Sequence, residues 1–188
     1  IHALTNKGMS GEIGFTESLE QRLEILDLNK NDIATFAKSL TKYITPGLKE
    51  LVLYLKDNNV DLWVLSGGLS EVITPALIDL GFDKNKIHGS GLSFDANGKY
   101  LGLASSDLYP CNQSKIKALE DKSWYKNWDK PSILIGDGFT DLQIYQAGMV
   151  DNFIAYTQHA KRQVVIDSAP YQADNIKDLK TILQDLLF

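Results

Sequence analysis

Cysteine is nearly absent from this sequence, in which Cys111 is the single cysteine among 188 residues. A lone cysteine excludes an intramolecular disulfide and a thiolate metal cluster, so we expect a reducing compartment, the cytoplasm. Cys111 is chemically able to act as a nucleophile, but we interpret it as a small packing residue.

Long apolar runs and an excess of positive charge are also lacking. No hydrophobic stretch approaches the length of a membrane span, and the first residues do not resemble a secretion signal. The formal net charge is -5, without the clustered basic stripe that binds a phosphate backbone. We therefore expect neither a membrane nor nucleic acid as a partner. The length suits one compact domain, and no repeat or linker interrupts it.

The most informative stretch is SILIGDGFTDL, residues 132–142. Its apolar run, residues 133–135, predicts a buried strand of a parallel sheet, and Asp137 follows where that strand should end. Asp141 fits the first turn of the next helix, so two carboxylates should converge on one crevice. The alternative is that Asp137 is a turn residue and Asp141 an acid that complements the helix dipole.

The N-terminal third is predicted to be helical, because apolar residues recur there at helical spacing. The first helix starts at Phe15, with Thr16 as its cap and with Leu19, Leu23 and Leu26 on its apolar face. The second is capped by Asn31 or Asp32 and places Ile33, Phe36, Ala37 and Leu40 on one face. The third opens at Thr45-Pro46-Gly47, with Thr45 as cap and Pro46 at the first helical position, and it buries Leu48, Leu51, Val52 and Leu55.

The rest of the chain alternates strands and helices, which predicts an α/β fold with a doubly wound parallel sheet. A strand is expected over Val60 to Leu65, running into Ser66-Gly67-Gly68, and a helix over Ile73 to Leu80, capped by Ser70 or Thr74 and stopped by Gly81. A hairpin should turn at Asn97-Gly98 within β structure from Ile87 to Leu103. The later elements are expected at Gln113 to Leu119 (helix), Phe153 to Tyr156 (strand), Lys161 to Ile166 (helix), Tyr171 (edge strand) and Ile176 to Leu187 (helix).

Two predicted strand ends carry polar tips, Ser66-Gly67-Gly68 and Asp137-Gly138, and Lys115 lies on a helix between them in sequence. A hydroxyl and glycine backbone N–H groups can cradle phosphate oxygens, and a lysine can neutralise them. Carboxylates such as those of Asp137 and Asp141 are hard ligands that suit Mg²⁺. This inventory fits phosphoryl transfer, although it lacks a nucleophile. The alternatives are a plain turn at the glycines and a solvated surface charge at Lys115.

These motifs resemble those of the haloacid dehalogenase superfamily. VLSGG (residues 64–68), the lysine of QSKIKAL (113–119) and GDGFTDL (136–142) look like its second, third and fourth motifs. GMSGEIGFTESLEQRLEIL (8–26) looks like the cap segment of the phosphoserine phosphatase branch, and FIAYTQHAKRQVVIDSAPY (153–171) also resembles that branch. The resemblance implies a helical cap over residues 1–44 and an α/β core over residues 45–188.

The resemblance also implies roles for individual residues. Ser66 and Gly67 would hold the phosphoryl group, with Lys115 neutralising it, Asp137 would ligate Mg²⁺, and Asp141 would orient groups nearby. Arg22 would grip a substrate carboxylate, for which its bidentate fork is suited. The alternative for this arginine is an ion pair on its own helix, with Glu17 or Glu20. The remaining substrate-binding residues would be Met9, Phe15 and Gly68.

The first motif of the superfamily, Asp-x-Asp-x-Thr/Val, does not occur before Gly8. It would supply the nucleophilic aspartate and the central strand, so we expect this chain to be inactive alone and to expose apolar surface and strand edges. Because Ile1 is not a methionine, we expect the natural product to be longer upstream or trimmed. The predicted function is a Mg²⁺-dependent phosphatase for a small, phosphoserine-like metabolite, acting through an aspartyl phosphate as a monomer or homodimer. The alternatives are a non-catalytic phosphate- and metal-binding relative and a phosphatase for a different ester.

Overall fold

The computed structural model describes residues 1–4, 7, 12–104 and 114–188. The chain forms two compact units, each assembled from two stretches of sequence. The first unit comprises Ile1–Thr45 and Leu62–Ser114, and the second comprises Pro46–Asp61 and Lys115–Phe188. Each unit is built around its own sheet of three strands.

The sheet of the first unit has the strand order β1-β2-β3. Its strands are β1 (Val64–Leu69), β2 (Ile87–Phe94) and β3 (Tyr100–Ala104). The pair β1-β2 is parallel and is connected by helix α5 (Ser70–Leu80), while β2 and β3 are antiparallel. The predicted hairpin turn is confirmed: Gly98 has a φ of 82°, and the Asp95 carboxylate accepts hydrogen bonds from the Asn97 and Lys99 backbone N–H groups, each at 2.8 Å.

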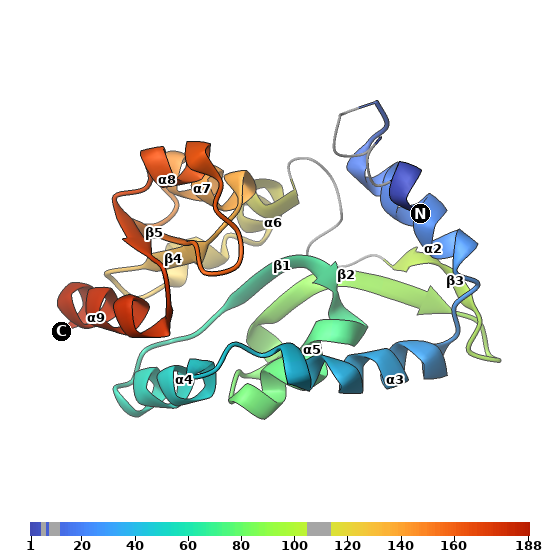
Figure 1. Ribbon diagram of the computed structural model, residues 1–188, viewed down its shortest axis with the longest axis horizontal. Coiled ribbons are helices and arrows are strands. Elements are labelled where there is room, and N and C mark those ends of the chain that lie inside the picture. The colour runs from blue at the N-terminus through green and yellow to red at the C-terminus, as the bar shows by residue number, and fades with distance from the viewer. Residues whose placement is uncertain (5–6, 8–11, 105–113) are drawn as a thin grey trace. The chain divides into compact units, whose positions relative to one another are not determined.

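The helices described beside this sheet include α5, α2 (Phe15–Ile25) and α3 (Lys30–Ser39). Figure 1 shows α3 and α5 running beside each other along the sheet. The apolar core of the unit includes one cluster formed by Leu23, Ile33, Val72 and Leu92. The predicted apolar faces are wrong at two positions, since Phe36 is 55% exposed and Leu26 is 48% exposed.

The predicted helix starts in this unit are wrong in detail. Helix α2 begins after Gly14 rather than with a cap at Thr16, because glycine is itself accepted at the N-cap. Helix α3 is capped by Asn29 rather than by Asn31 or Asp32. The Asn29 side chain accepts from two backbone N–H groups of the first turn, and Asp32 accepts from the Asn29 N–H, so this residue satisfies more orphan donors than the predicted caps.

Helix α5 also begins earlier than predicted. It starts at Ser70 instead of Ile73, includes Pro75, and has no side-chain cap, so neither Ser70 nor Thr74 serves as one. Its end is as predicted, because Gly81 adopts the left-handed conformation (φ of 106°) that closes a helix with little steric cost. Two 3₁₀ helices, η1 (Leu40–Tyr43) and η2 (Lys84–Lys86), complete the regular elements described for this unit.

The sheet of the second unit is fully parallel, in the order β4-β5-β6. Its strands are β4 (Ile133–Gly136), β5 (Asn152–Tyr156) and β6 (Tyr171–Ala173). The accompanying helices are α4 (Leu48–Asp57), α6 (Ser114–Lys122), η3 (Trp124–Asn127), α7 (Phe139–Gln146), α8 (Gln163–Ser168) and α9 (Ile176–Leu187). Figure 1 shows α7 and α8 on one side of this sheet and α9 on the other, which is the layering of a doubly wound fold.

The predicted start of α4 is wrong. The residue preceding α4 is Gly47, with a φ of 85°, and the first helical residue is Leu48, so Thr45 is not the cap and Pro46 is not the first helical position. A left-handed residue at this point turns the chain just before the helix, and glycine adopts that conformation without a Cβ clash. The predicted buried face is confirmed at Leu51, Val52 and Leu55, whereas Leu48 is only partly buried.

The α/β class is confirmed. Strands β1 and β4 are edge strands of their sheets, so among the described residues each has a strand partner on one side only. Ile135 of β4 is 40% exposed although it belongs to the apolar run that predicted the strand. Within the described ranges, we find no helix that is long and apolar enough to cross a membrane.

Asp151 links the starts of β4 and β5 and yields a first prediction. Its carboxylate accepts from the Ser132 N–H at 2.7 Å, the Ser132 hydroxyl at 2.8 Å and the Lys130 ammonium at 2.8 Å. These contacts, the Lys130 bond foremost, lower the pKa of Asp151 from 3.8 to about 2. Because the folded pKa is depressed, the stabilisation is present above the ordinary carboxyl pKa and is lost as the pH falls from about 4 through about 2.

We therefore expect Asp151→Asn to lower the free energy of unfolding by about 1 kcal/mol at pH 7 and by less at pH 2.5. The modest size reflects a side chain that is 38% exposed. Urea denaturation at the two pH values measures the difference. Asp129→Asn, which neutralises an exposed acid nearby, is the control and should change stability by less than about 0.5 kcal/mol. An Asp151→Asn effect that is the same at both pH values would contradict the assignment.

Candidate functional site

The predicted phosphate-binding tip lies inside a strand rather than after one. The sequence predicted a strand over Val60 to Leu65, but β1 runs from Val64 to Leu69 and contains Ser66, Gly67 and Gly68. The prediction failed because the apolar pattern extends upstream of the segment that pairs with β2. The polar tip is instead presented by an irregular part of the strand.

This irregularity is a bulge. Leu65 pairs with His88 and Leu69 pairs with Ser90, so residues 66–68 stand opposite a single residue of β2. A bulge of this kind interrupts the ladder and leaves its extra residues outside the regular pairing with the neighbouring strand. The Ser66-Gly67-Gly68 segment therefore leaves the regular ladder although the strand continues to Leu69.

Two serines hold the bulge in shape. The Ser66 Oγ accepts a hydrogen bond from the Gly68 N–H at 3.0 Å, and the buried Ser90 hydroxyl donates to the Gly67 carbonyl at 3.3 Å. A Cβ on Gly89 of β2 would stand 2.7 Å from the Gly68 carbonyl oxygen, so this close approach requires glycine. At Gly67, by contrast, no atom of the described residues other than its chain neighbours lies within 4 Å of a Cβ position, and the residue is exposed.

In the second unit, Asp137 lies where the sequence predicted it. Strand β4 ends at Gly136, Asp137 follows directly, and α7 begins at Phe139. Asp141 occupies the first turn of α7, and its Oδ2 accepts from the Gly138 N–H at 3.2 Å. Both acids therefore lie next to the carboxyl end of a parallel strand, which is where α/β proteins bind their ligands.

Lys115 and Asp141 form a largely buried ion pair. The Lys115 Nζ lies 2.5 Å from the Asp141 Oδ1, and the two side chains are 15% and 11% exposed. The alternative that Lys115 is a solvated surface charge is therefore wrong. Asp141 does complement the start of α7, which was the alternative interpretation of this acid. It also holds the Lys115 ammonium at the end of β4.

Gly136 leaves the space that the Asp141 side chain fills. A Cβ on Gly136 would lie 2.6 Å from the Cβ, the Cγ and the Oδ2 of Asp141. Such distances are shorter than any van der Waals contact, so the glycine before Asp137 allows the carboxylate of Asp141 to lie against the strand end. The spacing of glycine and acid in this motif thus has a packing reason.

Arg162, which sequence reasoning did not single out, is the partner of Asp137. Its Nη1 donates to the Asp137 carboxylate and to the Asp137 carbonyl oxygen, the latter at 3.0 Å. The contact joins the loops after two adjacent parallel strands, because β5 pairs with β4. That adjacency was the available signal, since residues following neighbouring parallel strands meet at one edge of the sheet.

A second polar cluster lies at the same edge of this sheet and also went unpredicted. Thr157, just after β5, donates its hydroxyl to the carboxylate of Asp174, just after β6, and Gln172 donates to the same oxygen at 2.9 Å. The Thr157 hydroxyl is the main cause that lowers the pKa of Asp174. The carboxyl ends of all three strands therefore carry ordered polar side chains.

The predicted substrate-binding residues belong to the first unit. Arg22 lies on α2, where its Nε donates to the Ser18 carbonyl at 3.0 Å. Phe15 is the first residue of that helix, whereas Met9 and the side chain of Phe15 lie outside the described residues. The substrate roles of Met9, Phe15, Arg22 and Gly68 stay predictions. Cys111 also lies outside the described part of the chain.

The donor set is compatible with Mg²⁺. The described residues contain no group of three or more histidine, cysteine, aspartate or glutamate side chains placed to hold a metal. Mg²⁺, however, typically takes one or two protein carboxylates and completes its shell with water and substrate phosphate. Asp137, a carboxylate 48% exposed at a strand end, fits that requirement.

The chain is similar in sequence and in structure to known hydrolases. Residues 14–146 match the family model described as haloacid dehalogenase-like hydrolase. The crystal structure of a phosphoserine phosphohydrolase-like protein from Francisella tularensis is similar with a TM-score of 0.81 and 34% identity, covering 97% of this chain and 83% of that one.

Two phosphoserine phosphatases are also similar in sequence. The chloroplastic enzyme of Arabidopsis thaliana is 29% identical over 167 residues, which is 89% of this chain and 56% of the plant protein. The Mus musculus enzyme is 26% identical over 190 residues, which covers 98% of this chain and 81% of the mouse protein. The chain thus spans between about half and about four fifths of the length of these curated relatives.

Proposed function

This chain belongs to the haloacid dehalogenase-like hydrolase family, in the phosphoserine phosphatase-like branch of phosphoric monoester hydrolases, and we propose that it carries the phosphate- and metal-binding residues of a phosphatase for a small phosphorylated metabolite. The observation that carries the proposal is the Lys115–Asp141 ion pair beside Asp137, at the carboxyl end of β4. It combines an immobilised cation with a carboxylate suited to a divalent metal.

We propose that uncharged donors and the lysine bind the phosphoryl group, and that an aspartate binds the metal. Ser66 and the Gly67 N–H would hold phosphoryl oxygens, since the bulge presents hydroxyl and backbone donors together. Lys115, held in place by Asp141, would neutralise the phosphoryl charge without reorganisation. Asp137 would ligate Mg²⁺, which when bound would polarise the phosphoryl group. Within this division, residues 1–44 would form the cap and residues 45–188 the core.

The nucleophile needs a carboxylate in an Asp-x-Asp-x-Thr/Val motif, and the 188 residues contain no such motif. We propose that hydrolysis proceeds through an aspartyl phosphate formed on such a motif in the full-length gene product, and that the 188 residues alone do not turn over. The coding sequence upstream of Ile1 is the direct check. If the gene lacks the motif, the proposal of an enzyme is wrong. The chain would then be a non-catalytic relative that binds phosphate.

The substrate would resemble phosphoserine, a small phosphate ester that also carries a carboxylate. Arg22 is the residue proposed to recognise that carboxylate, because a guanidinium pairs with it through two parallel hydrogen bonds. Arg22 lies on α2, the helix that follows Gly14, within the residues proposed as the cap. The relatives named phosphoserine phosphatase support this substrate class.

We expect Asp137→Asn in the full-length gene product to lower kcat/KM for phosphoserine at least about 100-fold, because the amide is a weaker ligand for Mg²⁺. Released phosphate is measured with and without Mg²⁺. The matched control is Asp185→Asn on α9, which removes the same charge from an exposed position and should leave the rate unchanged. Equal rates for Asp137→Asn and the unchanged protein would refute the metal role.

A further inference from the structure

Arg162 occupies the carboxylate that the proposed function assigns to the metal. We propose that Arg162 is a resident counter-cation of Asp137 which an incoming divalent cation must displace, so that this arginine sets the cation affinity of the site. The inference rests on the proposed metal role of Asp137. In this inference Arg162 controls how tightly the site binds a cation, and it has no role in substrate binding.

The contact uses the oxygens that a metal would need. A single guanidinium nitrogen, Nη1, donates both to the Asp137 carboxylate and to its carbonyl oxygen at 3.0 Å. Because the guanidinium carries a positive charge, it competes with a cation for the same oxygens. A divalent cation that approaches Asp137 therefore meets both an occupied carboxylate and a like charge.

The backbone that carries Arg162 is fixed independently of this contact. The Arg162 carbonyl accepts from the Val165 and Ile166 N–H groups, at 2.9 Å and 3.0 Å, which starts helix α8. Upstream, the Thr157 N–H donates to the Ala173 carbonyl at 2.9 Å, which ties the loop to β6. The side chain can therefore leave Asp137 without rearranging the loop.

Separating Arg162 from Asp137 also costs little desolvation free energy. The side chains of Arg162 and Asp137 are 52% and 48% exposed, so both remain hydrated when they separate. An ion pair this exposed contributes little free energy, which makes it displaceable by a divalent ion. In contrast, the largely buried Lys115–Asp141 pair is expected to stay closed during cation entry.

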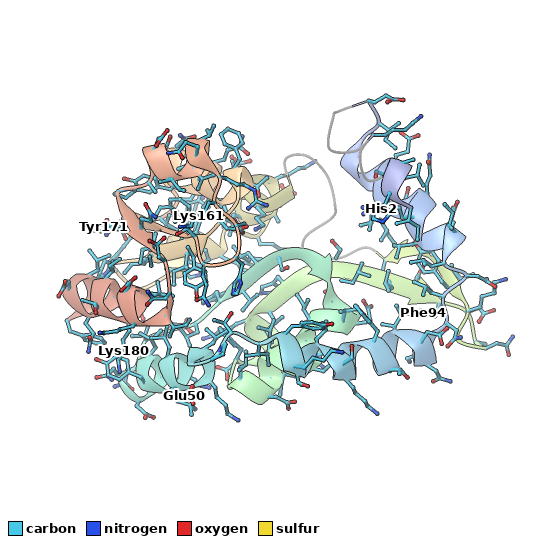
Figure 2. The ribbon with its side chains drawn as sticks, in the orientation of Figure 1. His2, Glu50, Phe94, Lys161, Tyr171 and Lys180 are labelled. Carbon is cyan, nitrogen blue, oxygen red and sulfur yellow. The ribbon has the colours of Figure 1, made fainter. Side chains whose placement is uncertain are left out.

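The chain offers a matched control one residue away. Lys161, labelled in Figure 2, carries the same charge but lies 3.9 Å from the Asp174 carboxylate, at the end of a different strand. Its side chain is 69% exposed. Neutralising Lys161 therefore makes the same change in net charge as neutralising Arg162 without freeing Asp137.

The experiment measures binding of Mn²⁺ alone to the 188-residue chain, from the free-ion signal in electron paramagnetic resonance. Arg162→Gln should lower the Kd for Mn²⁺ about threefold to tenfold, the range expected from losing an exposed ion pair and a nearby like charge. Lys161→Gln should stay within about twofold of the unchanged chain. Circular dichroism confirms that each variant keeps its helix content.

The outcomes separate this inference from the proposed function. If Arg162→Gln binds no tighter than the unchanged chain while Asp137→Asn loses binding, Arg162 is not a competitor, yet the metal role of Asp137 stands. If Asp137→Asn binds as well as the unchanged chain, the cation is elsewhere and both fail. If neither the unchanged chain nor Arg162→Gln binds Mn²⁺ at millimolar concentration, the inference is overturned as well. An Arg162→Gln gain that vanishes in the double variant with Asp137→Asn is the supporting result.

Discussion

Lys115→Met is expected to lower the free energy of unfolding by about 3 kcal/mol at pH 7. Methionine keeps the length and packing of the lysine stem but leaves Asp141, whose side chain is 11% exposed, as a charge without its cation. The Gly138 N–H still donates to the carboxylate at 3.2 Å, but one backbone donor does not replace an ammonium. Urea denaturation of the 188-residue chain measures the loss.

Lys117→Met is the control, because it makes the same substitution at an exposed position of the same helix. It should change stability by less than about 0.5 kcal/mol. The double variant Lys115→Met/Asp141→Asn should recover much of the loss, since it removes the second charge of the pair. A single Lys115→Met variant as stable as the unchanged chain would show that the pair contributes nothing to folding.

Gly136→Ala is expected to cost about 2 kcal/mol or more. The added methyl would lie 2.6 Å from three atoms of Asp141, so the carboxylate must move away from the strand end. That movement would lengthen the 2.5 Å contact with Lys115, so the variant disturbs the site as well as the packing. The measurement is again chemical denaturation.

Gly67→Ala is the matched control for this substitution, because in the described part of the chain only its chain neighbours lie within 4 Å of the Cβ that it adds. Its effect on stability should be within about 0.5 kcal/mol. Coupling supplies a further check: Gly136→Ala combined with Asp141→Ala should cost less than the sum of the two single variants. Strict additivity would contradict the packing role of Gly136.

Elements with a long, regular pattern were predictable from sequence. Helix α9 runs from Ile176 to Leu187 as its periodicity indicates, and the hairpin turns at Asn97-Gly98. Prediction failed where local signals competed. Thr45 and Pro46 form a good helix start, yet the left-handed Gly47 moves that start to Leu48. Here glycine's backbone freedom outweighed the capping preference.

The site was predictable where it follows strand ends in sequence. Asp137, Asp141 and Lys115 were all found from spacing and charge, and the structure brings them to the end of β4. The bulge that carries Ser66 was not predictable, because it depends on how β1 pairs with β2. The Arg162 contact depends likewise on β5 lying beside β4, so it becomes predictable only once the order of the strands in the sheet is known.

The division of the second unit into two distant stretches affects how the chain is made. Helix α4 packs against α9, and the Gln184 amide donates to the Tyr54 hydroxyl at 3.0 Å. During synthesis from the N-terminus, α4 therefore leaves the ribosome well before α9, the helix that it packs against. A single cut after Ser114 would leave α4 in the N-terminal fragment, although α4 belongs to the second unit. Neither unit can therefore be obtained whole as one contiguous piece of the chain.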